Sequence, residues 1–152
     1  MLQSIKSLLG FAENNNMENK KKMTLDIAVA AILIEIADTD GEFKDVERDT
    51  ILDALAYRLD ISKEDAEDFY REAVAVRNDS NDLWQFTNYL NNKLEDDERF
   101  EVLEEIWRVI LSDGKIDAYE DLLVRRFTSL LHLDHEDLIE AKMNIIEERK
   151  QA

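Results

Sequence analysis

Residues 38–47 read DTDGEFKDVE, and residues 112–120 repeat the same pattern as SDGKIDAYE. In each stretch an apolar residue comes two places after the glycine, and a glutamate comes seven places after the aspartate of the Asp-Gly pair. The chain has only three glycines, and Gly41 and Gly114 occupy these matching places. Glycine adopts positive φ at the end of a helix more readily than other residues do. The repeat therefore predicts two related helix-loop-helix units.

The composition predicts an all-α protein. The 152 residues include no proline, and residues that favour helices, such as Ala, Leu, Glu and Lys, are abundant. A chain of this length can bury a sizeable core within one domain. Because the chain has no cysteine, disulfides, thiolate metal sites and thiol redox chemistry are excluded.

Apolar residues at helical spacing predict three helices in each unit. We expect a first unit at residues 24–77, a connecting helix at 81–93 and a second unit at 97–149, within one domain that spans 24–150. The predicted fold is a single-domain bundle of about seven helices with pseudo-twofold symmetry. Residues 1–23 form a separate N-terminal segment that can add one more helix.

Particular side chains locate these helices. Thr24 and Ser62 are expected to cap helix N-termini, because each hydroxyl precedes a run of helical spacing. Large apolar side chains inside the predicted helices are expected to fill the core; they include Trp84, Phe86, Phe100, Trp107 and Leu122.

The charge of the chain is strongly negative and unevenly distributed. The formal net charge is −17, yet residues 1–23 carry four lysines against two glutamates. The remaining residues therefore carry a net charge of about −19. Since nucleic-acid affinity comes mainly from neutralising phosphates, the sequence excludes a nucleic-acid partner. Cations, basic protein partners and simple solubility are the remaining explanations of this charge.

Residues 1–23 are basic and amphipathic. Leu2, Ile5 and Leu8 fall on one helical face, and three lysines follow at residues 20–22. Such a segment can lie on an anionic membrane surface, although we favour a first helix folded onto the body, or a frayed end, as its explanation. No apolar run is long enough to span a bilayer, and no signal peptide is evident. We expect a cytoplasmic protein, with the inner face of the membrane as the alternative location.

The Asp-Gly loops hold the candidate metal ligands, which are Asp38, Asp40, Glu47, Asp113 and Glu120. Counted from residue 36, the first loop matches an EF-hand calcium loop at its third, fifth, sixth, eighth and twelfth positions but lacks the acid at the first. The second loop keeps fewer of these positions. A structural interpretation explains the same residues: the glycine ends one helix, the aspartate accepts loop N–H groups, and the glutamate suits the dipole of the next helix. We favour the structural interpretation, with Ca²⁺ or another divalent cation as the alternative.

No pattern in the chain indicates catalysis. His132 and His135 straddle a predicted helix boundary, and the chain has no third histidine to complete a nitrogen-based metal site. The three glycines are too far apart for a phosphate-binding loop. Carboxylates are so numerous that the sequence singles out no pair for acid-base chemistry. We therefore predict a protein that is not an enzyme and has no organic cofactor.

The repeated pattern resembles the bacterial tellurite-resistance TerB family. The resemblance rests on residues 35–41 with Phe43 and Glu47, and on residues 110–114 with Ile116 and Glu120, and it extends over about residues 24–148. It implies an all-helical fold of two related units, as in the N-terminal region of a membrane-anchored DnaJ-like co-chaperone. It also implies that the acids at positions 40, 47, 113 and 120 contact metal ions or partner proteins.

Two functional hypotheses follow. The favoured one is a non-enzymatic helical interaction or scaffold module in a stress-response or membrane-surface complex, with protein partners that the sequence does not name. The alternative is a divalent-cation sensor that uses the Asp-Gly loops. The sequence leaves the oligomeric state open.

Overall fold

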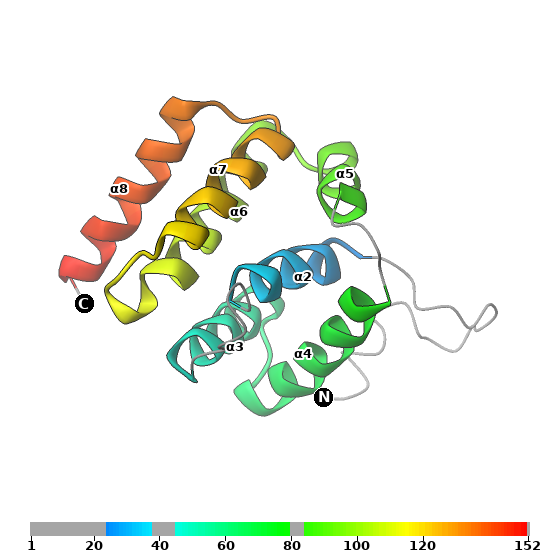
Figure 1. Ribbon diagram of the computed structural model, residues 1–152. Helices are drawn as coiled ribbons and strands as arrows, with labels where there is room; N and C mark the ends of the chain where they lie inside the picture. Colours follow the sequence, from blue (N-terminus) through cyan, green and yellow to red (C-terminus); the bar gives the residue numbers. More distant parts are fainter. Residues whose placement is uncertain (1–23, 38–44, 80–83, 152) are drawn as a thin grey trace.

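The computed structural model describes residues 24–37, 45–79 and 84–151 (Figure 1). Residues 1–23, together with Asp38, Asp40 and Gly41 of the first loop, lie outside the described residues, as does the side chain of Asp113. The described residues form seven α-helices and one short 3₁₀ helix, and they contain no strand. The elements are α2 (Leu25–Ala37), α3 (Asp45–Leu59), α4 (Lys63–Asn78), α5 (Trp84–Lys93), α6 (Asp96–Ile110), η1 (Leu111–Asp113), α7 (Ala118–Leu130) and α8 (His135–Gln151). The all-α prediction is confirmed.

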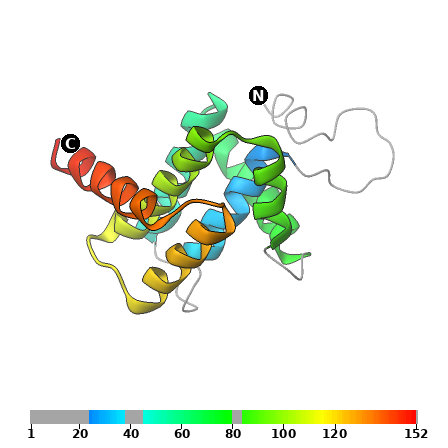
Figure 2. The same ribbon diagram turned by 90° about the horizontal axis from the view of Figure 1, so that it is seen from above.

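Helix α2 lies at the centre of the bundle (Figures 1 and 2). Ten of its thirteen residues are buried, because its sequence is apolar on every face and it contacts α3, α4, α5, α6 and α7. Its start is capped as predicted, since the Ile27 N–H donates to Thr24 Oγ1 at 3.1 Å. Glu35 is only partly buried, although its neighbours in the helix are buried, and it forms an ion pair with Arg77 of α4.

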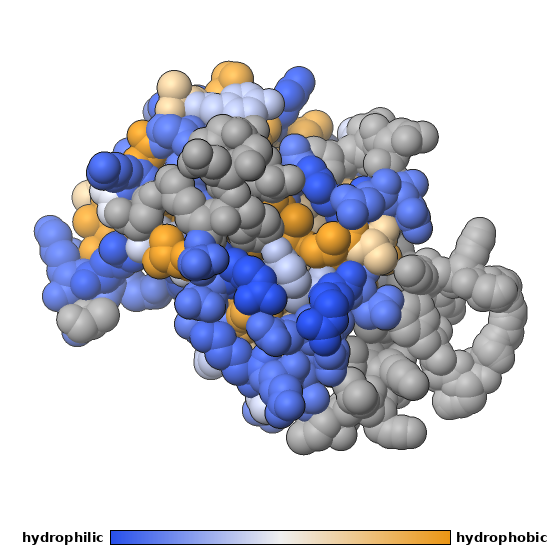
Figure 3. All heavy atoms as spheres, turned by 60° about the horizontal axis from the view of Figure 1, so that its bottom comes forward, coloured by the Kyte–Doolittle hydropathy of each residue, from blue (hydrophilic) through white to orange (hydrophobic). Residues whose placement is uncertain are grey.

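The remaining helices are amphipathic and share one continuous core with α2. Helix α6 places Trp107 in that core, where the indole Nε1 donates to the Leu138 carbonyl of α8 at 3.1 Å. Helix α8 packs on α6 and α7 at the edge of the bundle (Figures 1 and 2). On the face shown in Figure 3, hydrophilic side chains predominate, with hydrophobic patches between them. None of the helices in the described part of the chain is long and apolar enough to cross a membrane.

The helix ends follow the predicted turn chemistry. The Ser62 hydroxyl caps α4 by accepting from the Asp65 N–H at 3.0 Å. Asp134 holds the matching place before α8 and accepts from the Asp137 N–H at 2.9 Å. The two preceding turns also match, because Asp60 and His132 both have positive φ, at 57° and 62°.

Two predicted core residues are exposed instead. Leu122 is 57% exposed, because each helical residue turns by about 100° and this places it nearly opposite the buried Val124 on α7. Trp84 is 54% exposed, because it begins α5 on the side away from the buried Phe86. Phe86 and Trp107 are buried as predicted, and Phe100 is partly buried against the core.

Candidate functional site

Two glutamates from matching places in the repeat meet inside the protein. Glu47 lies in the first turn of α3 and Glu120 in the first turn of α7, 73 residues apart in sequence. Their exposed fractions are only 1% and 3%, and a side-chain hydrogen bond links the two carboxyl groups. We call these two residues the carboxyl pair. It connects the first unit to the second.

The loop before α7 fixes the position of Glu120. Gly114 has φ of 82°, and its N–H donates to the Leu111 carbonyl at 3.0 Å, which turns the chain after η1. Asp117 then caps α7: its Oδ1 accepts from the Glu120 N–H at 2.8 Å, and its own N–H donates to Glu120 Oε1 at 3.3 Å. Ile116 packs against the core. The predicted left-handed glycine and the predicted place of the glutamate in the first turn of the next helix are confirmed in this loop.

The surroundings of Glu120 favour its protonated form. Burial, the hydrogen bond with Glu47 and the negative charges of Asp117 and Glu47 raise the pKa of Glu120 to about 8, although the Asp117 N–H opposes the rise. At neutral pH the pair therefore holds a proton that a solvated glutamate would have lost.

The carboxyl pair offers oxygen ligands of the kind that Ca²⁺ and Mg²⁺ prefer. Of the five candidate ligands, the structure brings together Glu47 and Glu120. Asp38 and Asp40 lie outside the described residues, and the side chain of Asp113 is likewise not described. Among the side chains that the structure describes, no group of three or more His, Asp or Glu residues is arranged to hold a metal ion. The described residues of the pair would give a cation two carboxylate ligands, and a complete site would need others.

The repeat in the sequence aligns Glu47 with Glu120, but it predicts them in two separate loops. The repeat was the one sequence signal that related the two residues, and by itself it does not show how the two units pack. When two copies of a unit pack face to face, matching residues near the contact approach each other. An acid at such a place in both copies would be buried against its counterpart.

A second polar cluster also joins the units. The Arg58 guanidinium of α3 contacts Asp26 of α2 at 2.8 Å and Glu105 of α6 at 3.0 Å. Burial raises the pKa of Glu105, and the charge of Arg58 partly opposes this rise. A hollow of about 660 Å³ lies beside the cluster and is also lined by Tyr57, Asp60, and Glu101. Since Arg58 pairs with both acids and joins α3 to α2 and α6, we interpret this cluster as structural.

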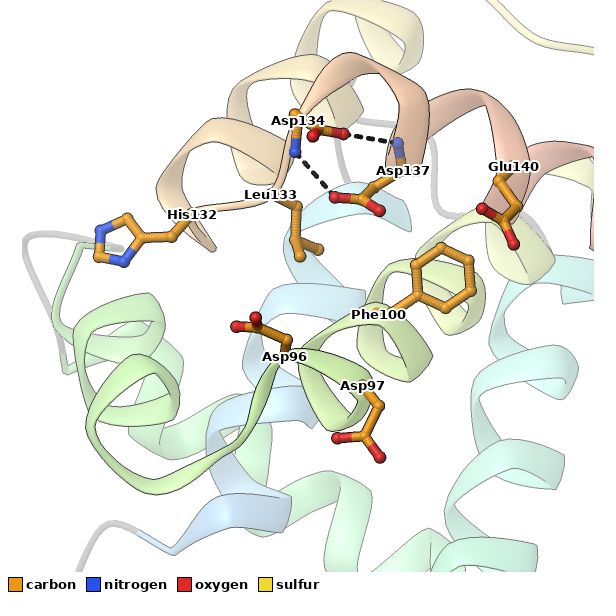
Figure 4. A pocket seen from close by; sticks show the side chains of 8 residues that line it. All are labelled: Asp96, Asp97, Phe100, His132, Leu133, Asp134, Asp137 and Glu140. Carbon is orange, nitrogen blue, oxygen red and sulfur yellow. Dashed lines mark hydrogen bonds between the residues drawn. The ribbon is translucent and has the colours of Figure 1, made fainter.

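A second hollow, of about 580 Å³, lies between the start of α6 and the start of α8 (Figure 4). Asp134 and Asp137 line it, but each accepts a hydrogen bond from the other's N–H and so caps α8. The N–H of Asp137 holds the pKa of Asp134 below its usual value. The His132 side chain points away from the other lining residues in Figure 4. His132 is therefore not directed at these acids, and neither histidine belongs to a group of three or more possible metal ligands among the described residues.

Comparison with known proteins identifies the family. A model of the family described as "Tellurite resistance protein TerB" matches residues 26–143. No curated protein and no solved structure matches the chain significantly. The matched region begins in α2, ends in α8 and includes both glutamates of the carboxyl pair. Because that family model covers well over half of the sequence, this chain belongs to the TerB family.

Proposed function

We propose that this TerB-family protein is a non-enzymatic interaction module whose two units are held together by a divalent cation at the carboxyl pair. The observation that carries the proposal is the contact between Glu47 and Glu120, two acids buried against each other from the two units. This contact favours the cation-binding hypothesis over a purely structural role of the loops.

The two carboxyl groups are costly to ionise together. Two carboxylates in contact inside a protein repel each other and lose their hydration, so both cannot stay ionised without compensation. A pKa of about 8 in place of an ordinary 4.5 corresponds to a penalty of up to about 5 kcal/mol for ionising Glu120. A bound divalent cation would neutralise both carboxylates and displace the shared proton. Loop carbonyls, water and the acids at positions 40 and 113 are the proposed sources of further ligands.

The interaction role rests on different features. The acidic body, with a charge of about −19 outside residues 1–23, favours basic protein partners over nucleic acids. The family name refers to tellurite resistance, which supports a role in a stress response. The basic amphipathic character of residues 1–23 supports placement at an anionic membrane surface.

A cation titration tests the proposal. The melting temperature is measured against CaCl₂, MgCl₂ or MnCl₂, with NaCl of equal ionic strength as the control for screening. We expect a saturable stabilisation by a divalent cation that follows RT ln(1 + [L]/Kd) and is accompanied by proton release near pH 7.

Two variants make the test specific. The double change Glu47→Gln and Glu120→Gln should abolish the saturable response while leaving the fold intact. Glu101→Gln, which changes an exposed acid of α6 outside the pair, is the matched control and should respond like the original protein. An equal response to NaCl, or a saturable response in the double variant, would contradict cation binding at the carboxyl pair.

A further inference from the structure

Asp117 holds one oxygen of the Glu120 carboxyl group. The N–H of Asp117 donates to Glu120 Oε1 at 3.3 Å, and the Asp117 side chain accepts from the Glu120 N–H at 2.8 Å. These reciprocal hydrogen bonds form a capping box at the start of α7. Because a backbone N–H at a helix start has a fixed direction, Oε1 is turned towards the backbone of residue 117 while the carboxyl group of Glu120 contacts Glu47.

This arrangement differs from the one that a calcium loop uses. Glu47 and Glu120 each hold the twelfth position when the two loops are counted as EF-hand loops. In an EF-hand, the glutamate at this position binds Ca²⁺ with both of its oxygens, so both must be turned towards the ion. While the Asp117 N–H holds Oε1, Glu120 offers a cation one oxygen in place of two.

The number of ligands also distinguishes between the two common divalent cations. Ca²⁺ takes about six to eight oxygens, whereas Mg²⁺ gives up its water reluctantly and is held by one or two carboxylates together with several waters. Among the side chains that the structure describes, no third His, Asp or Glu joins Glu47 and Glu120 in a group of ligands. Two carboxylates, one of them limited to a single oxygen, suit a cation that brings its own water.

We propose that the carboxyl pair binds Mg²⁺ in preference to Ca²⁺, and that Asp117 is a positioning residue that sets this preference through its hydrogen bond to Glu120 Oε1. The inference rests on the proposed binding of a divalent cation at the pair, and it adds the identity of that cation. Asp117 is not itself a ligand, because its carboxylate caps α7. The EF-hand spacing of the loops favours Ca²⁺, so the two interpretations predict opposite orders of affinity.

Isothermal titration calorimetry of the full chain measures this order. MgCl₂ and CaCl₂ are titrated separately at one pH, with NaCl keeping the ionic strength constant. We expect the Kd for Mg²⁺ to be lower than the Kd for Ca²⁺ by at least about threefold. A smaller difference, or tighter binding of Ca²⁺, would overturn the preference and leave cation binding at the pair intact. Absence of saturable binding with either cation would overturn both.

Two variants at position 117 test the positioning role. Asp117→Pro removes the N–H that holds Glu120 Oε1, and the φ of −87° at this place is close to the range of proline. Asp117→Ala is the matched control, because it also loses the capping carboxylate but keeps the N–H. We expect the ratio of the two affinities to shift towards Ca²⁺ by at least about threefold in Asp117→Pro and to stay nearly unchanged in Asp117→Ala. An equal shift in both variants, or an unchanged ratio in a folded Asp117→Pro variant, would overturn the role of the N–H.

Infrared difference spectroscopy tests the coordination in the original protein, so it does not depend on the folding of a variant. Relative to a free carboxylate, the separation between the asymmetric and symmetric stretches widens when one oxygen binds a cation and narrows when both oxygens bind. We expect the spectrum with MgCl₂, minus the spectrum without it, to show a widened separation that is absent in Glu120→Gln. A spectrum that shows only narrowed separations would mean that both oxygens of each glutamate bind the cation, which would contradict the proposal.

Discussion

Helices α2 and α6 open the two units at matching places in the repeat, yet they are buried to different extents. Ten of thirteen residues of α2 are buried, against six of fifteen in α6. With the offset of 73 residues that aligns the loops, Ala28 and Ala31 of α2 correspond to Glu101 and Glu104 of α6. Helix α2 lies between the other helices, whereas α6 keeps one side in solvent. The repeat therefore determines loops and helix ends, and the place of each helix in the bundle determines which faces are buried.

The largest expected effect tests this difference in burial. Ala28→Glu in α2 should prevent folding, because an unpaired charge at a fully buried place costs on the order of 5 kcal/mol or more. Glu101→Ala at the matching place in α6 should change stability by less than about 0.5 kcal/mol. Urea unfolding followed by circular dichroism measures both. A folded Ala28→Glu variant would show that α2 is not enclosed.

The second prediction concerns the matching glutamates, whose burial is the same in both units. The pKa of Glu120 is raised to about 8, so the folded protein keeps a proton that the unfolded chain loses near pH 4.5. The stabilising contribution of the protonated Glu120 is therefore complete below about pH 4.5 and falls as pH rises towards 8, by on the order of 4 kcal/mol. Chemical unfolding at several pH values measures the change. The difference between the original protein and Glu120→Gln isolates it, and a difference that stays constant over this range would contradict the prediction.

A smaller loss of stability is expected when the glycine of either loop is replaced. Gly114→Ala should cost about 1 kcal/mol, because φ of 82° strains an alanine although a Cβ there would meet no atom within 4 Å. Gly41→Ala should cost a similar amount if the first loop repeats the second. Unfolding midpoints of both variants provide the measurement. A neutral Gly41→Ala beside a destabilised Gly114→Ala would show that the two loops differ in backbone conformation.

The smallest expected effect concerns residues 1–23, whose charge is opposite to that of the rest of the chain. Deleting them should leave the melting temperature almost unchanged and should weaken any binding to anionic vesicles. Calorimetry and vesicle flotation test the two parts of this prediction. A large loss of stability would mean that this segment belongs to the core.

Much of the fold could be predicted from the sequence, because the signals were local. Helical periodicity predicted the helices, and Thr24, Ser62 and Gly114 have the capping and turn roles that their side chains suggest. The exposure of Trp84 and Leu122 was missed, because an apolar residue inside a helical pattern can still lie on its outward face. Local pattern does not show which face the rest of the bundle covers.

The candidate site was predictable residue by residue but not as an arrangement. The repeat placed Glu47 and Glu120 at matching positions, each in the first turn of a helix. The dipole interpretation expected a charged glutamate, whereas the raised pKa keeps Glu120 protonated at neutral pH. Their mutual contact depends on how the two units pack. Since that packing is long-range, no local sequence pattern could reveal that the two acids form one buried pair.

The shared, buried carboxyl pair is tested most directly by titrating the Glu120 side-chain carboxyl carbon by ¹³C NMR, with divalent cations removed by a chelator. We expect a Glu120 pKa of about 8, and a lower pKa in Glu47→Gln, because that change removes the neighbouring charge and alters the hydrogen bond. A Glu120 pKa near its ordinary value of 4.5, unaffected by Glu47→Gln, would contradict the claim that the two units meet at a shared, buried carboxyl pair.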